Sequence, residues 1–426
     1  MNQHPDTSAD DQNHVAVPVR FGCVGLGGYA GASCEFLERC EGDSSIAGAI
    51  RLTAVCEPDQ RRHAGAIKRL RGRGVRVVEK YEDLLNEPVE AIWLPLPIDL
   101  HRPYTIQALE AAKGVLCEKP AAGSVDDVDA MIAARDRLQQ PVLIGYQHMY
   151  HPATAQIKRL LLDGAIGSIR SASVCACWPR STDYFSRNDW VGRYQRDGAW
   201  VMDSPANNAL AHYLNLSLFL LGESVSDSAA LSDVEAELYR ANAIETNDTA
   251  ALRITTQRGI PLLALLTHAC GESLGPIIRV DGTEGSLTLV PDGQTTMTTR
   301  RSSQNWPAYG DCRSHMISSM RQLIREGKTT NTTATLETSR AQTVVINAAS
   351  QVAPVHKIPQ SMVRQVAVDN QQVRAVRGIE SLFEQCVSSG KLPHESGQVD
   401  WSVPAKKLSI RDYQHFTGPC RVPSAS

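Results

Sequence analysis

Short apolar runs alternate with helical patterns between residues 19 and 146 of the chain. Apolar residues that recur every three or four positions predict helices, and apolar runs of four to eight residues predict buried strands. Six strands are predicted, at Val19–Gly25, Leu52–Glu57, Val75–Val78, Ala91–Leu96, Val115–Glu118 and Pro141–Tyr146. Helices are predicted at Ala32–Arg39, Tyr81–Asn86, Arg102–Ala112 and Val125–Gln139. Strands that are apolar throughout and separated by helices indicate a doubly wound α/β domain with a parallel sheet covered on both faces.

After residue 146 the pattern changes, because strand-like runs follow one another with few helices between them. Strands are predicted at Ile169–Cys177, Val234–Tyr239, Thr249–Thr255, Pro261–Ala269, Ile277–Asp281 and Ser286–Val290. Helices are predicted at Ala153–Leu162, Ala206–Leu221, Met316–Arg325 and Glu337–Ser350. Strands in succession favour an open, largely antiparallel sheet, and we therefore predict an α+β domain over residues 147–356.

The two ends of the chain differ in character. Residues 1–18 are polar and acidic, without a basic start or an apolar segment, which predicts a disordered lead-in and not a secretory signal. Residues 357–426 form a C-terminal extension with a predicted helix at Val373–Ser389. We expect the extension to be ordered, because the rings of Trp401, Tyr413 and Phe416 are costly to leave in water.

Charge and cysteine spacing narrow the classes of partner. The net charge of −3 gives no general attraction to nucleic acid or to an anionic membrane. No apolar run approaches the ~20 residues that span a bilayer. The 11 cysteines are scattered and lack the paired spacing of a zinc site, so we expect buried thiols and no metal. These features predict a cytoplasmic protein whose partner is a small molecule.

The sequence FGCVGLGGYAGASCEFL, residues 21–37, places glycines between the first predicted strand and the first predicted helix. It fits the spacing G-x-G-x-x-G/A of dinucleotide-binding turns, which predicts cofactor binding by Gly25, Leu26, Gly27, Gly28, Tyr29 and Ala30. Gly25 permits a tight turn, Gly27 lets the backbone approach a pyrophosphate, and Ala30 lets helix and strand pack closely. The helix N-terminus then offers unpaired N–H groups to the phosphates.

Glu57, at the end of the second predicted strand, is the expected partner of a ribose diol. It follows Gly25 by 32 residues, which exceeds the usual ~20, and we attribute the excess to a polar insert at residues 41–49. An acidic residue at this place repels a 2′-phosphate and favours NAD over NADP. Arg61 and Arg62 are close enough in sequence to accept such a phosphate, so NADP stays an alternative.

Three further motifs carry a resemblance to a known family. They are Pro95-Leu96-Pro97-Ile98-Asp99-Leu100-His101, Glu118-Lys119-Pro120, and Gly145-Tyr146-Gln147-His148-Met149-Tyr150-His151-Pro152. Together with the glycine turn they resemble the Gfo/Idh/MocA family of glucose–fructose oxidoreductases and inositol dehydrogenases, over residues 19–356. The resemblance implies an NAD(P)-binding Rossmann domain at residues 19–146 and a substrate-binding and oligomerisation domain at residues 147–356.

The resemblance gives Lys119 a place beside both the nicotinamide and the reacting hydroxyl. Partial burial beside a cationic nicotinamide lowers the pKa of a lysine, which suits it to proton transfer. The resemblance also implies cofactor contacts from Pro97, His101 and Glu118. The alternative interpretation of Lys119 is a surface lysine at the end of a strand.

A second catalytic signature of the family is Asp-x-x-x-His-x-x-Asp on a helix of the second domain. The best register here is Asn208-Ala-Leu-Ala-His212-Tyr-Leu-Asn215, whose spacing places the three polar residues on one helix face. The resemblance implies that His212 is a general acid or base, although amides stand where the family has carboxylates. Either Asp203 or Asn208 is expected to orient it. Without the resemblance, the favoured interpretation of His212 is a core histidine with its hydrogen bonds satisfied.

The stretch Trp178–Trp200 is polar and aromatic. Its aromatic residues are interleaved with Arg187, Arg193 and Arg196. One interpretation is a loop that lines the substrate cleft, with rings stacked on a sugar and arginines bound to hydroxyls or a carboxylate. The other is a subunit contact or plain packing. At the join between the predicted domains, His148 is a candidate substrate contact.

These features predict an NAD(P)-dependent oxidoreductase that transfers a hydride between nicotinamide and a sugar, polyol or related hydroxyl compound. Lys119 and His212 are predicted to handle the hydroxyl proton, with His148 and Asn208 as further substrate contacts. By analogy with the family, the sheet of the second domain is expected to pair with another subunit in a homodimer or homotetramer. Two alternatives are an NAD-dependent glycosidase that oxidises its sugar transiently, and a non-catalytic NAD-binding sensor.

Overall fold

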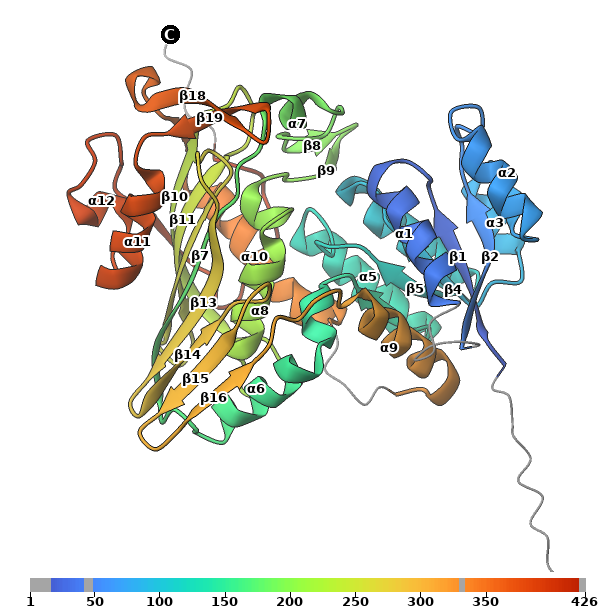
Figure 1. Ribbon diagram of the computed structural model, residues 1–426, viewed down its shortest axis with the longest axis horizontal. Coiled ribbons are helices and arrows are strands. Elements are labelled where there is room, and N and C mark those ends of the chain that lie inside the picture. Colours follow the sequence, from blue (N-terminus) through green and yellow to red (C-terminus); the bar gives the residue numbers. More distant parts are fainter. Residues whose placement is uncertain (1–16, 42–48, 329–333, 421–426) are drawn as a thin grey trace, which may run out of the picture.

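The computed structural model describes residues 17–41, 49–328 and 334–420 of the chain. Figure 1 shows two lobes side by side, one formed by the N-terminal part of the chain and one by a long sheet with the C-terminal extension on its outer side. The predicted lead-in at residues 1–18 and the polar insert at residues 41–49 lie almost wholly outside the described residues. Within the described ranges, no helix is both long and apolar enough to cross a membrane.

The first lobe is built on six parallel strands in the order β3-β2-β1-β4-β5-β6. The strands are β1 Val19–Val24, β2 Ile50–Cys56, β3 Arg76–Val78, β4 Ala91–Leu94, β5 Gly114–Cys117 and β6 Val142–Ile144. The helices are α1 Gly28–Cys40, α2 Ala64–Gly72, α3 Tyr81–Asn86, α4 His101–Glu110 and α5 Val125–Leu138. The predicted doubly wound domain is confirmed. Its strand order reverses between β1 and β4, where such sheets bind ligands at their carboxyl edge.

The second lobe contains a ten-stranded mixed sheet in the order β16-β15-β14-β13-β7-β12-β11-β10-β17, with β20 also paired to β10. Its strands are β7 Ile169–Cys177, β10 Leu231–Arg240, β11 Thr249–Thr256, β12 Pro261–Thr267, β13 Leu274–Gly282, β14 Gly285–Leu289, β15 Thr295–Thr299, β16 Ser303–Trp306, β17 Val355–Lys357 and β20 Lys406–Ser409. Its main helices are α6 Pro152–Leu162, α8 Ala211–Leu220 and α10 Leu336–Val352, whereas α9 Arg313–Glu326 packs against β1 and β5 of the first lobe (Figure 1). Only β7–β12 and β10–β17 pair in parallel among these strands, so the predicted open, largely antiparallel sheet is confirmed.

The helix predicted at residues 206–221 is shorter than expected. A 3-10 turn, η3 Pro205–Asn207, comes first, and α8 begins only at Ala211. Asn208 lies between them with φ −131° and ψ −95°, which is outside the helical range. The prediction that Asn208 shares a helix face with His212 is therefore wrong. Asparagine is a poor residue for a helix interior, and the Asn208 side chain instead bonds to the side chains of Asp203 and Lys119.

The helix predicted at residues 373–389 is wrong in its first part. β18 Val363–Val368 and β19 Gln371–Val376 form an antiparallel hairpin, and α11 Ile379–Ser389 begins after it. Asp369 and Asn370, between the two strands, have φ values of +49° and +62°. Positive φ at both central residues is the geometry of a two-residue hairpin turn, for which aspartate and asparagine are suited. The Asp-Asn pair was the signal that the apolar pattern obscured.

The C-terminal extension covers one face of the second sheet. Cys175, Tyr239 and Leu265 lie on that face and pack against Phe383 of α11 and Leu392, which precedes α12 Pro393–Ser396. Side chains at alternate positions of the same strands belong to the other core, with α8 and α10. This part of the sheet is therefore occupied by the chain's own extension and is not open to another subunit; a homodimer or homotetramer stays a prediction.

The rings of Trp401, Tyr413 and Phe416, on which the prediction of an ordered extension rests, contact other parts of the chain, although the buried Nε1 of Trp401 has no hydrogen-bond partner among the described residues. The Trp401 ring lies edge-on to Tyr239, with centroids 5.0 Å apart. The Phe416 ring lies 4.8 Å from that of Trp200, in the middle of the chain. The Tyr413 hydroxyl donates to Oε1 of Gln351 on α10 at 2.7 Å. The extension thus packs against Tyr239 of the second sheet and against helix α10.

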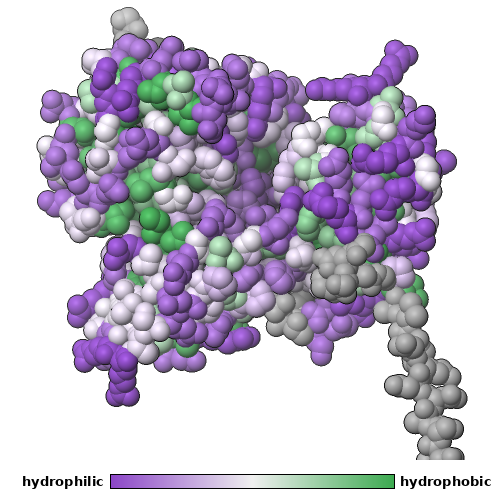
Figure 2. Space-filling view, viewed as in Figure 1, coloured by the Kyte–Doolittle hydropathy of each residue, from purple (hydrophilic) through white to green (hydrophobic). Residues whose placement is uncertain are grey.

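Helix α10 joins the two lobes. Nε2 of Gln342 donates to the Ala206 carbonyl at 2.8 Å, and its Oε1 accepts from the Tyr146 hydroxyl at 3.1 Å. One turn and a half later, Nδ2 of Asn347 donates to the Gly123 carbonyl at 2.9 Å. In the space-filling view, a hollow with mainly hydrophilic walls separates the lobes (Figure 2). The candidate site residues meet in this region.

Candidate active site

The glycine turn between β1 and α1 leaves room for a pyrophosphate. Gly25 has φ +91°, which favours glycine, and a Cβ there would lie 2.9 Å from the Cβ of Ala30. α1 begins at Gly28, directly after its N-cap Gly27. The first N–H groups of a helix have no partner within the helix and attract anions. This geometry is compatible with the phosphates of a dinucleotide, and the binding of phosphates by these residues stays a prediction.

Glu57 fastens this turn to the end of β2. Its Oε2 accepts the N–H of Leu26 at 2.7 Å, and its Oε1 accepts the N–H of Asp59 at 2.7 Å. A carboxylate oxygen has two acceptor positions, so each one retains capacity for a ribose hydroxyl. Arg61 and Arg62 are exposed on the loop that follows.

His101 ties together the loops that follow β4 and β5. Its side chain is fully buried, with Nδ1 2.8 Å from the Pro120 carbonyl oxygen and Nε2 2.9 Å from that of Leu96. Burial lowers the pKa of His101, and the neutral ring donates to one of the two carbonyls. The two loops carry Pro97 and Lys119, and the Lys119–Pro120 peptide bond is cis. His101 is thus placed to hold both loops at the crevice, with its own side chain enclosed.

Glu118 connects the glycine turn to the lysine beside it. Its Oε1 accepts from Nε1 of Trp93 at 3.2 Å and from the Tyr29 hydroxyl at 3.3 Å, and its Oε2 accepts the N–H of Lys119 at 3.2 Å. Burial raises the pKa of Glu118, and the Lys119 ammonium opposes that shift. A Cβ on Gly145 would lie 2.8 Å from the carboxyl group. Glycine at this place therefore makes room for the buried acid.

Lys119, Asn208 and Asp203 form one hydrogen-bonded chain. Nζ of Lys119 donates to the carbonyl oxygen and to Oδ1 of Asn208, both at 3.1 Å. Nδ2 of Asn208 donates to Oδ1 of Asp203 at 2.8 Å, and Oδ2 of Asp203 accepts the N–H of Gly192 at 2.7 Å. Burial lowers the pKa of Lys119, against the carboxylates of Glu118 and Asp203. A buried carboxylate thus orients an amide, and the amide holds the lysine.

His212 lies near this chain but is not part of it. Its Nδ1 is buried and has no hydrogen-bond partner among the described residues, so neither Asp203 nor Asn208 orients it. The pKa of His212 is well below its ordinary value, first because of burial and then because of the charge of Lys119. The imidazole is therefore neutral near pH 7. The two residues that the sequence assigned to His212 instead position Lys119.

His148 packs beside His212, with ring centroids 5.4 Å apart. It belongs to η2 Gln147–Tyr150, stacks on Tyr213 at 5.6 Å, and burial lowers its pKa to about 4. Its Nδ1 is a second buried ring nitrogen without a partner in the described chain. In the part of the chain that the structure describes, no group of three or more His, Cys, Asp or Glu side chains is arranged to hold a metal ion.

The polar and aromatic stretch at residues 178–200 follows β7 and reaches the first lobe. Arg196, on the short strand β8 Gln195–Arg196, pairs with Asp99 of the loop after β4 at 2.7 Å. This contact places the stretch over the crevice and supports its interpretation as a cleft loop. Arg180 was not predicted as a site residue, although it follows Trp178 by two residues just after β7. Its guanidinium carbon lies 4.6 Å from the centre of the Trp178 ring.

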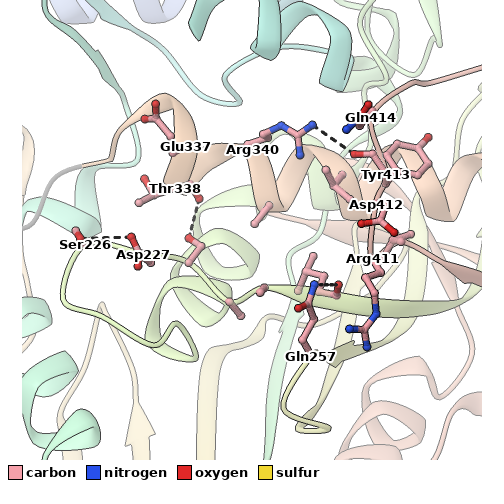
Figure 3. A pocket seen from close by; sticks show the side chains of 17 residues that line it. Ser226, Asp227, Gln257, Glu337, Thr338, Arg340, Arg411, Asp412, Tyr413 and Gln414 are labelled. Atoms are coloured by element: carbon pink, nitrogen blue, oxygen red, sulfur yellow. Dashed lines mark hydrogen bonds between the residues drawn. The ribbon is translucent and has the colours of Figure 1, made fainter.

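A groove of about 420 Å³ lies apart from these residues, where residues 226–231, the start of α10 and residues 410–414 meet (Figure 3). Glu337 and Arg340 on its rim are already ion-paired with Arg135 and Asp129 of α5, at 2.5 and 2.6 Å. None of the predicted site residues lines it. The groove is a seam where the extension packs on α10, and the candidate site is the region around Lys119.

The fold is shared with a solved dehydrogenase. The structure of WlbA from Bordetella pertussis, solved with NADH and UDP-GlcNAcA, has a TM-score of 0.62 to this protein and is 20% identical to it. The match covers 78% of this chain and 95% of the WlbA chain. At this identity the likeness supports the fold alone.

Curated relatives match shorter parts of the chain. D-apiose dehydrogenase of Paraburkholderia graminis is 26% identical over 57% of this chain and 61% of its own length. Inositol 2-dehydrogenase of Rubrobacter xylanophilus is 34% identical over 37% of this chain and 42% of its own length. The chain thus spans about half the length of these two relatives.

Family models match both lobes. The Gfo/Idh/MocA model described as an oxidoreductase family with an NAD-binding Rossmann fold matches residues 19–146, and the model of the Gfo/Idh/MocA C-terminal domain matches residues 154–288. The first match includes the glycine turn, Glu57 and the Glu118-Lys119-Pro120 motif described above. The chain belongs to the Gfo/Idh/MocA family of oxidoreductases, and its first lobe is the NAD-binding Rossmann domain of that family.

Proposed function

We propose that the protein is an NAD-dependent oxidoreductase that moves a hydride between nicotinamide and a hydroxyl-bearing carbon of a sugar or polyol. The observation that carries the proposal is the position of Lys119, held by both oxygens of Asn208 at the carboxyl edge of the Rossmann sheet. The relatives named above are dehydrogenases, which favours net oxidation or reduction over a glycosidase or a sensor.

In this proposal Lys119 exchanges the proton of the reacting hydroxyl. An ammonium has three N–H donors, and Asn208 takes two of them, which leaves one for a substrate oxygen. The lowered pKa of Lys119 increases the share of neutral amine, the form that accepts a proton when a hydroxyl is oxidised. Asp203 and Asn208 are positioning residues, since the carboxylate fixes the amide with its oxygen toward the lysine.

His212 is the second proton-handling group of the proposal. Its imidazole is neutral near pH 7 and lies close enough to Lys119 for that charge to lower its pKa. Buried polar atoms without hydrogen-bond partners are uncommon, and Nδ1 of His212 and Nδ1 of His148 are two such atoms on neighbouring rings. In this proposal, a substrate hydroxyl between the lobes is a hydrogen-bond partner for the two imidazole rings, which packing alone does not provide.

The cofactor would be held by the glycine turn, the N-terminus of α1 and Glu57, with the loops of Pro97 and Glu118 beside it. When bound, it supplies the acceptor or donor of the hydride. We propose NAD over NADP because the carboxylate of Glu57, fixed by two backbone N–H groups, would meet a 2′-phosphate with like charge. The cytoplasmic location stays a prediction from the sequence.

The test supplies the protein with NAD and then NADP against a panel of sugars, polyols and aryl glycosides, while nicotinamide absorbance and aglycone release are followed together. Reduced nicotinamide should accumulate, with NAD preferred. Aglycone release without accumulation would establish the glycosidase instead. Tight nucleotide binding without turnover of any compound would favour the sensor.

A further inference from the structure

Four arginines on the stretch at residues 178–200 fall into two pairs with different partners. Arg193 and Arg196 are ion-paired, with Glu245 at 3.7 Å and with Asp99 at 2.7 Å. The other two, Arg180 and Arg187, have aromatic partners. Their guanidinium carbons lie 4.9 and 3.9 Å from the centre of the Tyr184 ring.

Within the described residues, Arg180 and Arg187 form no ion pair with a carboxylate. Arg180 also has a buried Nε that no described residue accepts from. Two guanidinium groups on one aromatic ring repel each other, and a buried guanidinium N–H without an acceptor is costly. The pair therefore lacks the anion that would satisfy it.

The arginine pair lies beside the candidate catalytic groups. Tyr184, whose ring both guanidinium groups contact, lines a small cavity together with Asp203 and His268. Asp203 is the residue that orients the amide bound to Lys119. The charges of both arginines reach Lys119 and contribute to its lowered pKa.

The segment that carries the pair is fixed from two sides. The N–H of Arg180 donates to the His268 carbonyl at 3.2 Å. Ser181 forms a backbone bridge with Val373 of the C-terminal hairpin, and its side chain accepts the N–H of Tyr184 at 3.2 Å, at the start of α7 Thr182–Ser186. A group held in this way binds a ligand without losing much conformational freedom, which strengthens binding.

We infer that the substrate carries an anionic group, a carboxylate or a phosphate, which Arg180 and Arg187 bind while a hydroxyl of the same molecule meets Lys119. This inference rests on the proposed function and names its substrate class. The planar guanidinium matches both anions with paired N–H donors, and such charge-assisted hydrogen bonds are the stronger kind. The selected compounds are thus sugar acids or sugar phosphates, with neutral polyols as poor substrates.

The test compares D-glucuronate, D-gluconate and D-glucose 6-phosphate with the neutral D-glucose and myo-inositol, at constant ionic strength. Binding to the NADH-loaded protein is measured by calorimetry, and turnover with NAD by nicotinamide absorbance. At least one anionic compound should exceed its neutral counterpart in kcat/KM by on the order of 100-fold. Carboxylate and phosphate arms identify which anion is selected.

Three variants locate the anion. Arg180→Gln and Arg187→Gln should each raise KM and the calorimetric Kd for the anionic compound by roughly 10- to 100-fold, with values for neutral compounds within about threefold. Arg193→Gln is the matched control, because Arg193 lies on the same stretch and is paired with Glu245 at the surface. It should leave all values within about twofold. Arg187 is exposed, so its variant stays informative if Arg180→Gln folds poorly.

The outcomes separate this inference from the proposed function. The anionic site is overturned if neutral compounds turn over as well as the anions, or if neither variant changes anion binding. The proposed oxidoreductase function is unaffected by either result. Anion binding that the variants abolish, without turnover, keeps the site and counts against the oxidoreductase. Absence of both binding and turnover across the panel counts against both.

Discussion

Lys119 and Lys158 are two lysines whose ammonium groups lie inside the protein and whose pKa values burial lowers. Lys158, on α6, is fully buried, and its Nζ donates to the carbonyls of Phe219, Gly222 and Asp227 at 2.5, 2.7 and 3.4 Å. Lys119 is only partly buried and donates twice, both times to Asn208.

The hydrogen-bond acceptors around the two ammonium groups differ in number, and this difference distinguishes a structural lysine from a candidate catalytic one. The carbonyls of Phe219 and Gly222 lie at the end of α8, where a cation is favoured, and together with that of Asp227 they accept from all three donors of the Lys158 ammonium. Lys119 keeps one donor and stands near His212, whose Nδ1 has no partner in the described chain. A lowered pKa alone therefore does not single out a catalytic lysine in this protein, and the unused donor of Lys119 is the feature that supports its proposed role.

Replacing Lys119 is expected to have the largest effect. Lys119→Met keeps the volume of the side chain but removes the proton donor and acceptor, so kcat should fall by roughly 10²- to 10⁴-fold. The dissociation constant for NADH, measured by fluorescence, should change by less than about threefold, since the glycine turn and Glu57 are untouched. A kcat within tenfold of the wild type would remove Lys119 from the mechanism.

Replacing Lys158 should affect stability and not the chemistry. Lys158→Met leaves three buried carbonyls without their donor, and the free energy of unfolding should fall by about 3 kcal/mol. Denaturant unfolding of the two proteins gives this difference, and kcat per folded molecule should stay within about twofold. Unchanged stability with lost turnover would reverse the roles of the two lysines.

The pH dependence of stability sharpens the contrast. Burial lowers the pKa of Lys158 to about 7, whereas an unfolded lysine has a pKa near ~10.4. Between these values the unfolded chain keeps a proton that the folded lysine releases together with one of its three N–H donors, so stability rises with pH and is lost as pH falls toward 7. From pH 7 to 9 the wild type should gain about 2 kcal/mol relative to Lys158→Met. A difference that is flat over this range would show that the three carbonyls keep the ammonium charged.

Asp203→Asn should give the smallest effect, through the positioning of Lys119. An amide at this position replaces one of two acceptors by an N–H donor, so either Nδ2 of Asn208 or the N–H of Gly192 loses its acceptor, which loosens the hold of Asn208 on Lys119. The expected loss in kcat is about tenfold. Removal of the carboxylate also removes a charge that raises the pKa of Lys119, so the alkaline rise of the pH–rate profile should move to lower pH. A purely structural role would lower kcat without moving the profile.

Most of the first lobe could be predicted because its signals are local, although α2 Ala64–Gly72 was not expected. Its strands are short runs made mostly of apolar residues, and the glycine turn is specified by six consecutive residues whose backbone must turn tightly beside a helix N-terminus. The second lobe was predicted less completely. β15 and β16 are made largely of threonine, serine and other polar residues, so no apolar run predicted these two strands.

The sequence by itself determined the nucleotide-binding domain, the class of the second sheet and the candidate groups Lys119, His212 and Asp203. Only the tertiary structure decided how they are connected. Lys119 and Asn208 are 89 residues apart in the sequence, and Lys158 and Phe219 are 61 residues apart. No local sequence pattern therefore indicates either contact. Hydrogen bonds between residues so far apart form only when the chain packs, because a buried polar group bonds to a partner that tertiary packing places next to it.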